Sequence, residues 1–303
     1  MILFRKLICN CHKSFKFEIV EYFSLFYMDN KVIVLTGGGG VLGKTMALAL
    51  AKKGAKLAIL DLRKDAAEEV VKEIKTQGGV AIGIAADVLS KESLLKARTE
   101  INSKLGSCDI LINGAGGNHP KGTTSNTHLV LEDLENKQND FKTFFDLDSE
   151  GIQFVFNLNF IGTLLPTQVF AQDMIGKDGC SILNISSMNA FTPLTKIPAY
   201  SGAKAAISNF TQWLAVHFAK VGIRVNALAP GFFLTDQNRS LLTDSEGNPT
   251  QRGKTIIEHT PMGRYGEPED LIGTTEWLCS DGSKFVTGIV VPIDGGFSAF
   301  SGV

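Results

Sequence analysis

Short apolar runs alternate with amphipathic segments along most of the chain. The runs show no polar alternation, which is typical of strands buried on both faces of a parallel sheet. They lie at residues 32–35, 56–60, 80–86, 110–113, 181–185, 224–229 and 289–293. The helical segments between them lie at residues 44–53, 64–77, 90–105, 151–175, 199–220 and 267–279. This alternation predicts an α/β fold: a single Rossmann-like, doubly wound parallel sheet of about seven strands, with helices on both faces.

Two polar stretches interrupt the alternation, at residues 117–150 and 235–261. Each follows the carboxyl end of a predicted strand, which is the edge where such sheets bind ligands. We therefore expect both stretches to be substrate-loop insertions. Residues 1–28 precede the regular pattern, and we interpret them as a loosely ordered extension of a single domain at residues 29–303.

The composition argues against several classes of function. The 303 residues carry 30 basic and 31 acidic side chains, so no charge excess points to a nucleic acid partner. No uninterrupted apolar run approaches the ~18 residues of a membrane span. Five scattered cysteines favour free thiols in a reducing compartment, hence a cytoplasmic protein. Cys9, Cys11 and His12 lack a second ligand pair at zinc spacing, so we expect no metal site there.

A glycine-rich loop joins the first predicted strand to the first helix. In residues 36–43 (T-G-G-G-G-V-L-G), glycines let backbone N–H groups approach a pyrophosphate at the helix N-terminus. The P-loop pattern G-x-x-x-x-G-K-T also fits from Gly38 to Thr45, so this stretch alone leaves an ATPase or GTPase open. Asp61 ends the next strand, where a dinucleotide site places a carboxylate against ribose hydroxyls. It favours NAD over NADP; the alternative is a solvated strand-end carboxylate.

One predicted helix carries a tyrosine and a lysine on the same face. Tyr200 and Lys204 are four residues apart. An ammonium group close to a phenol stabilises the phenolate, so we expect Lys204 to lower the pKa of Tyr200 from about 10 toward the working range of an acid–base catalyst. Ser187 follows a buried strand and supplies a hydroxyl for the same carbonyl oxygen.

Together these residues resemble the short-chain dehydrogenase/reductase family, from about Lys31 to the C-terminus. The loop at 36–43 is similar to the family's T-G-x-x-x-G-x-G, with Val41 in place of the middle glycine. Other blocks match in order, which excludes the P-loop interpretation. They are D-V at 87–88, N-G-A-G at 113–116, N-F-I-G at 159–162, N-I-S-S at 184–187, Y-x-x-x-K at 200–204, P-G at 230–231 with Thr235, and D-G-G at 294–296.

The resemblance implies a role for each matched residue. Tyr200 is the general acid in ketone reduction and the base in alcohol oxidation, Ser187 holds the substrate oxygen, and Lys204 tunes Tyr200 and binds the nicotinamide ribose. Asn159 positions a water that connects Lys204 to solvent. The cofactor is NAD(H), and no metal is required. The residues implied to bind the cofactor are Gly37, Gly40, Leu42, Gly43, Asp61, Asp87, Val88, Asn113, Gly114, Ala115, Tyr200, Lys204, Pro230, Gly231, Phe233 and Thr235.

The blocks around the two insertions resemble one branch of the family, the D-mannonate oxidoreductases, also called fructuronate reductases. This resemblance implies reduction of D-fructuronate to D-mannonate with NADH. A sugar acid needs partners for its hydroxyls and a cation for its carboxylate. The candidates are Asn118, His119, Asn189, Lys196 and Arg239. Each has an alternative interpretation: His119 before a proline shapes a turn, and the two cations are solvated.

Other functions remain open at this point. The same fold acts on other polyols and sugars, on steroids and on 3-oxoacyl thioesters, although the hydrophilic insertion at 117–150 argues against a lipid-like substrate. A nucleotide-binding protein without catalysis would not need Ser187, Tyr200 and Lys204 together. The family resemblance also implies a homodimer or homotetramer, in which the helices predicted at 151–175 and 199–220 pair with those of a second copy.

Overall fold

The fold is built on a seven-stranded sheet in the order β3-β2-β1-β4-β5-β6-β7, with every neighbouring pair parallel. The computed structural model describes residues 27–136, 138, 140–235 and 238–302, so most of the predicted extension at 1–28 lies outside the described residues. The strands are β1 Val32–Thr36, β2 Lys56–Asp61, β3 Val80–Ala85, β4 Ile110–Asn113, β5 Cys180–Ile185, β6 Ile223–Pro230 and β7 Val290–Ile293. The predicted fold class is confirmed.

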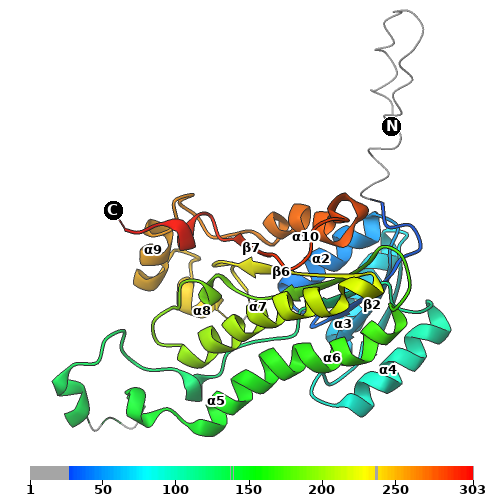
Figure 1. The fold of residues 1–303 in the computed structure, drawn as a ribbon. Helices are drawn as coiled ribbons and strands as arrows, with labels where there is room; N and C mark the ends of the chain where they lie inside the picture. The colour runs from blue at the N-terminus through cyan, green and yellow to red at the C-terminus, as the bar shows by residue number, and fades with distance from the viewer. Residues whose placement is uncertain (1–26, 137, 139, 236–237, 303) are drawn as a thin grey trace, which may run out of the picture.

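Helices cover both faces of this sheet (Figure 1). They are α2 Val41–Lys52, α3 Lys64–Thr76, α4 Lys91–Lys104, α5 Ser149–Phe156, α6 Gly162–Phe170, α7 Pro198–Phe218, α8 Arg239–Leu242, α9 Gln251–Glu258 and α10 Ile272–Cys279. Side chains that alternate along β1 enter different cores. Val32 and Val34 pack with α4, α6 and α7, whereas Ile33 and Leu35 pack with α2, α3 and α10. The absence of polar alternation in the strands follows from this double coverage.

The single helix predicted at 151–175 is interrupted. A π-helical turn, Asn157–Ile161, separates α5 from α6, and Pro166 lies inside α6. Proline has no N–H to donate, and π turns are frequent at functional sites. The segment Ser149–Asp173 has the length and composition of a membrane span, but half of its most apolar window is buried in the fold.

The first insertion projects beyond α5 (Figure 1), and two backbone hydrogen bonds hold it, one to the body and one that closes the base of the insertion on itself. The N–H of Thr124 donates to the carbonyl of Lys196 at 2.9 Å, and the N–H of Asp148 donates to the carbonyl of Lys121 at 3.2 Å. Between these anchors the described residues form only short 3-10 turns.

The second insertion contains the helices α8 and α9, which the sequence pattern did not predict. Gly253 lies in α9 where a Cβ would overlap the carbonyl oxygen of Leu242 and the hydroxyl of Tyr265. Close backbone packing through this glycine holds α9, a short amphipathic helix, against the loop.

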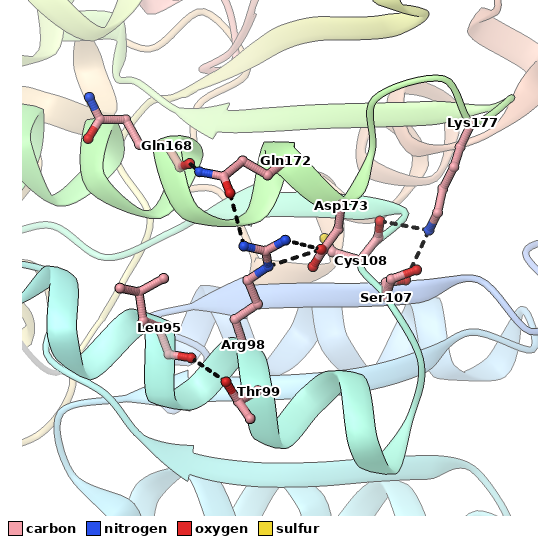
Figure 2. Close-up of polar contacts among 9 residues, drawn as sticks. All are labelled: Leu95, Arg98, Thr99, Ser107, Cys108, Gln168, Gln172, Asp173 and Lys177. Atoms are coloured by element: carbon pink, nitrogen blue, oxygen red, sulfur yellow. Dashed lines mark hydrogen bonds and ion pairs between the residues drawn. The ribbon is translucent and has the colours of Figure 1, made fainter.

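A half-buried cluster of polar side chains lies at the end of the sheet where the strands begin (Figure 2). Arg98 on α4 donates to Asp173 at 2.9 Å and to Gln172 at 3.1 Å, both just after α6. Lys177 donates to Asp109 at 3.0 Å and to the carbonyl of Cys108 at 3.2 Å, before β4 begins. These contacts stabilise the amino-terminal edge, away from the predicted site residues.

Candidate active site

Four adjacent strands end next to one another at the edge where the predicted site residues follow. Thr36 at the end of β1 pairs with Asn113 at the end of β4, and Asn113 pairs with Asn184 near the end of β5. β6 ends beside them at Pro230. Because the strands are parallel, the turns that leave them all emerge at this edge. The predicted motifs are therefore brought together although they are far apart in sequence.

The glycine loop leaves backbone N–H groups without side-chain partners at the start of α2. Gly37 has a φ of +65°, a conformation that favours glycine. A Cβ on Gly43 would lie 2.9 Å from the Cα of Gly38, so α2 packs this closely on the loop only through glycine. The residue before α2, Gly40, provides no side-chain cap. Uncapped N–H groups at a helix N-terminus bind anions, so the loop fits the pyrophosphate of a dinucleotide. The predicted contact residues Gly37, Gly40, Leu42 and Gly43 all lie in this loop or in the first turn of α2.

Asp61 lies directly beside the glycine loop. Its carboxylate accepts hydrogen bonds from the N–H of Gly39 at 3.1 Å and from the N–H of Arg63 at 3.0 Å. A Cβ on Gly39 would lie 2.9 Å from this carboxylate. The carboxylate therefore both fixes the loop and places a negative charge at the edge next to it.

The predicted adenine-contacting pair follows β3. Asp87 is exposed, and its carboxylate accepts a hydrogen bond from the N–H of Leu89 at 2.8 Å. Val88 is buried and packs against Gly162 at the start of α6, where a Cβ would lie 3.0 Å from it. The aspartate is thus available to a ligand, whereas the valine side chain is part of the core.

The turn after β4 is fixed by a residue that the sequence analysis did not single out. The hydroxyl of Thr36 accepts hydrogen bonds from the N–H groups of Gly114 at 3.1 Å and Ala115 at 3.3 Å. The sequence feature that could have indicated this role is the position of Thr36 as the first residue of the T-G motif. Thr36 therefore ties this turn to the glycine loop.

Asn113 turns its side chain away from the edge and into the core. Its amide donates to Thr167 at 3.0 Å and to the amide oxygen of Asn184 at 2.9 Å, and it is 1 % exposed. Only the backbone of Asn113 lies at the edge, so its predicted place beside the cofactor does not involve the side chain.

Backbone packing shapes the turn after β6. A Cβ on Gly231 would lie 2.6 Å from the Cα of Asp294, so the turn touches the segment after β7. Phe233 is buried, and the N–H of Thr235 donates to the side chain of Asn238 at 2.8 Å. These residues lie along one side of the carboxyl end of the sheet, and the side chain of Phe233 packs beneath them.

Tyr200, Lys204 and Ser187 come together between β5 and the first turns of α7. The amine of Lys204 is buried, donates to the carbonyl of Ile185 at 2.7 Å, and lies 5.5 Å from the centre of the Tyr200 ring. The hydroxyl of Ser187 accepts a hydrogen bond from the N–H of Asn189 at 3.3 Å. Two hydroxyl groups and an amine are therefore brought together at this end of the sheet, with Ser187 and Lys204 buried and Tyr200 half-buried.

Burial shifts both titratable groups toward their neutral forms. Desolvation raises the pKa of Tyr200 to about 12, and a hydrogen bond with Ser187 lowers this pKa without reversing the shift. Desolvation lowers the pKa of Lys204 to about 7. The expectation that Lys204 lowers the pKa of Tyr200 below 10 is therefore wrong for this structure, because spacing on a helix does not report burial. A tyrosine that stays protonated at neutral pH is a proton donor.

Asn159 lies in the π-helical turn next to Lys204. Its amide nitrogen donates to the carbonyl of Gly117 at 2.7 Å, and its amide oxygen accepts from the N–H of the same residue at 3.3 Å. A Cβ on Gly116 would lie 2.7 Å from this oxygen and 3.2 Å from the amine of Lys204. Gly116 was not predicted as a site residue, yet its missing side chain leaves the space between the two polar groups.

The substrate candidates differ in their placement. Asn118 donates to Thr123 at 3.1 Å and His119 accepts from the N–H of Lys121 at 3.1 Å, so both shape the turn of the first insertion. Arg239 is exposed on α8. The remaining two candidates lie between Ser187 and Tyr200: Asn189 is buried, and Lys196 is half-buried with a φ of +71°. Across the ranges that the structure describes, no group of three or more His, Cys, Asp or Glu side chains is arranged to hold a metal ion.

Comparison with known proteins matches this arrangement to one family. A family model described as short chain dehydrogenase matches residues 31–246. An "Uncharacterized oxidoreductase" of Haemophilus influenzae is 58% identical over 91% of this chain and 96% of that protein. The "Uncharacterized oxidoreductase UxuB" of Bacillus subtilis is 51% identical over 91% and 98%. A crystal structure of a "putative D-Mannonate oxidoreductase" from Haemophilus influenzae, with bound NAD, has a TM-score of 0.87 and 57% identity, covering 91% of this chain and 98% of that one.

The burial of Lys204 predicts a pH dependence of stability. The folded protein holds this amine neutral above a pKa of about 7, whereas the unfolded chain keeps it protonated up to 10.5, so unfolding takes up a proton between these values. The stability that the fold gains from a neutral rather than a charged Lys204 amine is complete above pH 10.5 and is lost as the pH falls through 7. Urea unfolding across this window is expected to show a free energy that rises with pH, relative to Lys204→Met, by up to about 1.4 kcal/mol per pH unit.

A matched control for this measurement is Lys104→Met. Lys104 is exposed and pairs with Glu100 on the surface of α4. The free energy of unfolding of the Lys104→Met variant should therefore run parallel to that of wild type across the same pH range. Parallel curves for wild type and Lys204→Met would contradict the assignment of a neutral, buried amine.

Proposed function

This chain belongs to the short-chain dehydrogenase family, and from that membership we propose that it is an NAD(H)-dependent oxidoreductase interconverting a ketone and a secondary alcohol. The observation that carries the proposal is the meeting of buried Ser187, buried Lys204 and half-buried Tyr200 at the end of the sheet that also holds the uncapped N-terminus of α2. A hydride carrier and a proton donor are the two components that carbonyl reduction needs.

In this mechanism bound NAD(H) supplies the hydride for reduction and accepts it in oxidation. The hydroxyl of Tyr200 donates its proton to the carbonyl oxygen, so that the C=O group becomes CH–OH. The hydroxyl of Ser187 hydrogen-bonds the same oxygen and orients it. Because burial keeps Tyr200 protonated at neutral pH, reduction starts with the acid in the required form. Lys204 lies under the ring, where its protonated form stabilises the phenolate that remains after the transfer.

Replacing the proton donor tests this mechanism. Tyr200→Phe removes only the hydroxyl, and we expect kcat to fall by about 10²–10⁴-fold, because that is what a positioned general acid contributes. NADH affinity, followed by the fluorescence of the bound nicotinamide, is expected to stay within a few-fold of wild type. Tyr265→Phe is the control, since the Tyr265 hydroxyl contacts only the carbonyl of Leu242 among the described hydrogen bonds. Near-normal turnover in Tyr200→Phe would remove the tyrosine from the proton-transfer step.

We propose NAD rather than NADP as the cofactor on account of Asp61. Its carboxylate is fixed beside the glycine loop by two backbone N–H groups. A ribose hydroxyl can donate to such a carboxylate, whereas a ribose phosphate would be repelled by it.

The preference is tested by Asp61→Ala. Removing the charge should raise the ratio of kcat/KM for NADPH to that for NADH by about tenfold or more, in line with the loss of one like-charge repulsion. Asp65→Ala serves as the control, because Asp65 is an exposed acid in the first turn of α3. An unchanged ratio in Asp61→Ala would exclude this carboxylate from the ribose site.

For the substrate we propose D-fructuronate, reduced to D-mannonate. The name of the NAD-bound relative and the polar first insertion support a sugar acid. Lys196 supports it further: it forms no ion pair with any residue that the structure describes. It also adopts a φ of +71°, with its carbonyl held by the N–H of Thr124. Such strained residues persist where the surroundings impose them, often at functional sites. We assign Lys196 the substrate carboxylate.

A substrate panel tests this assignment. D-Fructuronate, neutral ketoses, a 3-oxoacyl thioester and an oxosteroid are each offered with NADH. Lys196→Met is expected to raise KM for D-fructuronate by about tenfold or more while changing kcat/KM for a neutral ketose only a few-fold, because a charge-assisted bond is lost with one substrate alone. Lys121→Met is the control, since Lys121 pairs with Asp148. Equal effects on charged and neutral substrates would contradict the role of Lys196.

We also propose that a second copy of the chain covers the exposed apolar face of α5 and α7. Phe154, Phe156, Trp213 and Val216 are all exposed there. Such a patch marks an interaction site. Light scattering of the wild-type protein is expected to give the mass of a dimer or tetramer. The Trp213→Glu variant is expected to have a lower mass in solution. A monomeric wild type would contradict the proposal.

A further inference from the structure

Asn189 carries a buried acceptor that the protein leaves unpaired. It lies in the 3-10 turn Met188–Ala190 and is 5% exposed. Its amide oxygen has no hydrogen-bond partner. A buried acceptor in this state destabilises the fold, so it calls for a specific explanation.

Two buried asparagines near this end of the sheet, Asn184 and Asn226, use both ends of their amides. Asn184 accepts from Asn113 at 2.9 Å and donates to Thr211 at 2.9 Å. Asn226 donates to the carbonyl of Val286 at 2.9 Å and accepts from the N–H of Ile289 at 3.2 Å. The amide oxygen of Asn113 has no partner either, but Asn113 lies inside the core, with its amide nitrogen bonded to Thr167 and Asn184. Asn189 differs from Asn113 in its place, because it lies in the turn that Ser187 caps.

The position of Asn189 relates this oxygen to the reacting centre. Its own N–H donates to the hydroxyl of Ser187 at 3.3 Å, the hydroxyl that is proposed to hold the carbonyl oxygen of the substrate. Ser187 caps the turn that carries Asn189. A substrate whose carbonyl binds at Ser187 therefore lies beside the turn that carries Asn189, and the substrate group nearest to this turn is expected on a carbon atom next to the carbonyl.

We propose that the amide oxygen of Asn189 accepts a hydrogen bond from a substrate hydroxyl on the carbon next to the reacting carbonyl. This inference rests on the proposed function and narrows its substrate class to α-hydroxy ketones and the matching vicinal diols. A hydroxyl donates to an acceptor, a carboxylate or second ketone cannot, and a methylene leaves the acceptor unpaired. Steroids and 3-oxoacyl thioesters, with a methylene or an apolar carbon at that place, are thereby disfavoured.

The test compares two ketones that differ by one hydroxyl, 3-hydroxy-2-butanone and 2-butanone, in wild type and in Asn189→Leu. Leucine has a similar volume and no polar atom. Wild type is expected to prefer the hydroxy ketone by at least about tenfold in kcat/KM, because a site built to bond a hydroxyl rejects the analogue that lacks it. Asn189→Leu is expected to lose this preference, mainly through slower turnover of the hydroxy ketone.

Ser201→Ala is the matched control. Ser201 follows Tyr200 on α7, is also 5% exposed, and its hydroxyl also lacks a partner. Loss of that hydroxyl should change kcat/KM for the two ketones by the same factor. NADH affinity and the thermal midpoint show that each variant folds, and Asn189→Ala replaces Asn189→Leu if the leucine is not accommodated.

The possible results distinguish failure of the inference about Asn189 from failure of the proposed oxidoreductase function. Loss of the hydroxyl preference in the Asn189 variants but not in Ser201→Ala supports the inference. Retention of the preference in a folded Asn189 variant overturns the inference and leaves the proposed function standing. Failure of wild type to oxidise NADH with either ketone or with D-fructuronate overturns the proposed function together with the inference.

Discussion

The hydrogen bond from the buried amine of Lys204 to the carbonyl of Ile185, at 2.7 Å, joins the end of β5 to α7. The hydroxyl of Ser186 reinforces the same junction, donating to the carbonyl of Lys204 at 3.0 Å. Ser187 follows on the strand side and Tyr200 lies on the helix side, so their relative position is set by this contact. The low polarity that makes the amine costly to charge is also what keeps the phenol protonated. The buried junction between β5 and α7 therefore determines both the relative position of Ser187 and Tyr200 and the pKa values of Tyr200 and Lys204.

A continuous set of buried polar side chains extends this junction to the π-helical turn. Asn184 on β5 donates to Thr211 on α7 at 2.9 Å and accepts from Asn113 on β4, which also donates to Thr167 on α6. The hydroxyl of Thr163, one turn earlier on α6, donates to the carbonyl of Asn159 at 2.8 Å. These buried hydrogen bonds join β4, β5, α6 and α7 in one arrangement, although the amide oxygen of Asn113 has no partner. This network therefore fixes the π turn relative to the helix that carries Tyr200 and Lys204.

The sequence predicts this fold well because each strand is buried on both faces and each motif follows a strand end. Such features are local in the chain, so periodicity and spacing report them. No period marks the π-helical interruption at 157–161. Helix α9 is amphipathic but short, and it lies inside a polar stretch that the sequence analysis interpreted as an insertion loop. The shift of the pKa of Tyr200 depends on burial, and the inward turn of Asn113 depends on partners from α6 and β5. Neither can be obtained from the spacing of residue types.

The two residues proposed to select the substrate, Asn189 and Lys196, both lie in the loop between Ser187 and Tyr200. The loop is held at one end by the serine cap and at the other by the start of α7. Its strained lysine is held by the backbone of Thr124 in the first insertion. At the root of that insertion, Asn118 bonds to the side chain of Thr123, and His119 accepts from the backbone N–H of Lys121. If the loop binds the substrate as proposed, the insertion acts on it indirectly, by imposing the shape of that loop. A change in the length of the insertion would then alter specificity while leaving the proton-transfer groups in place.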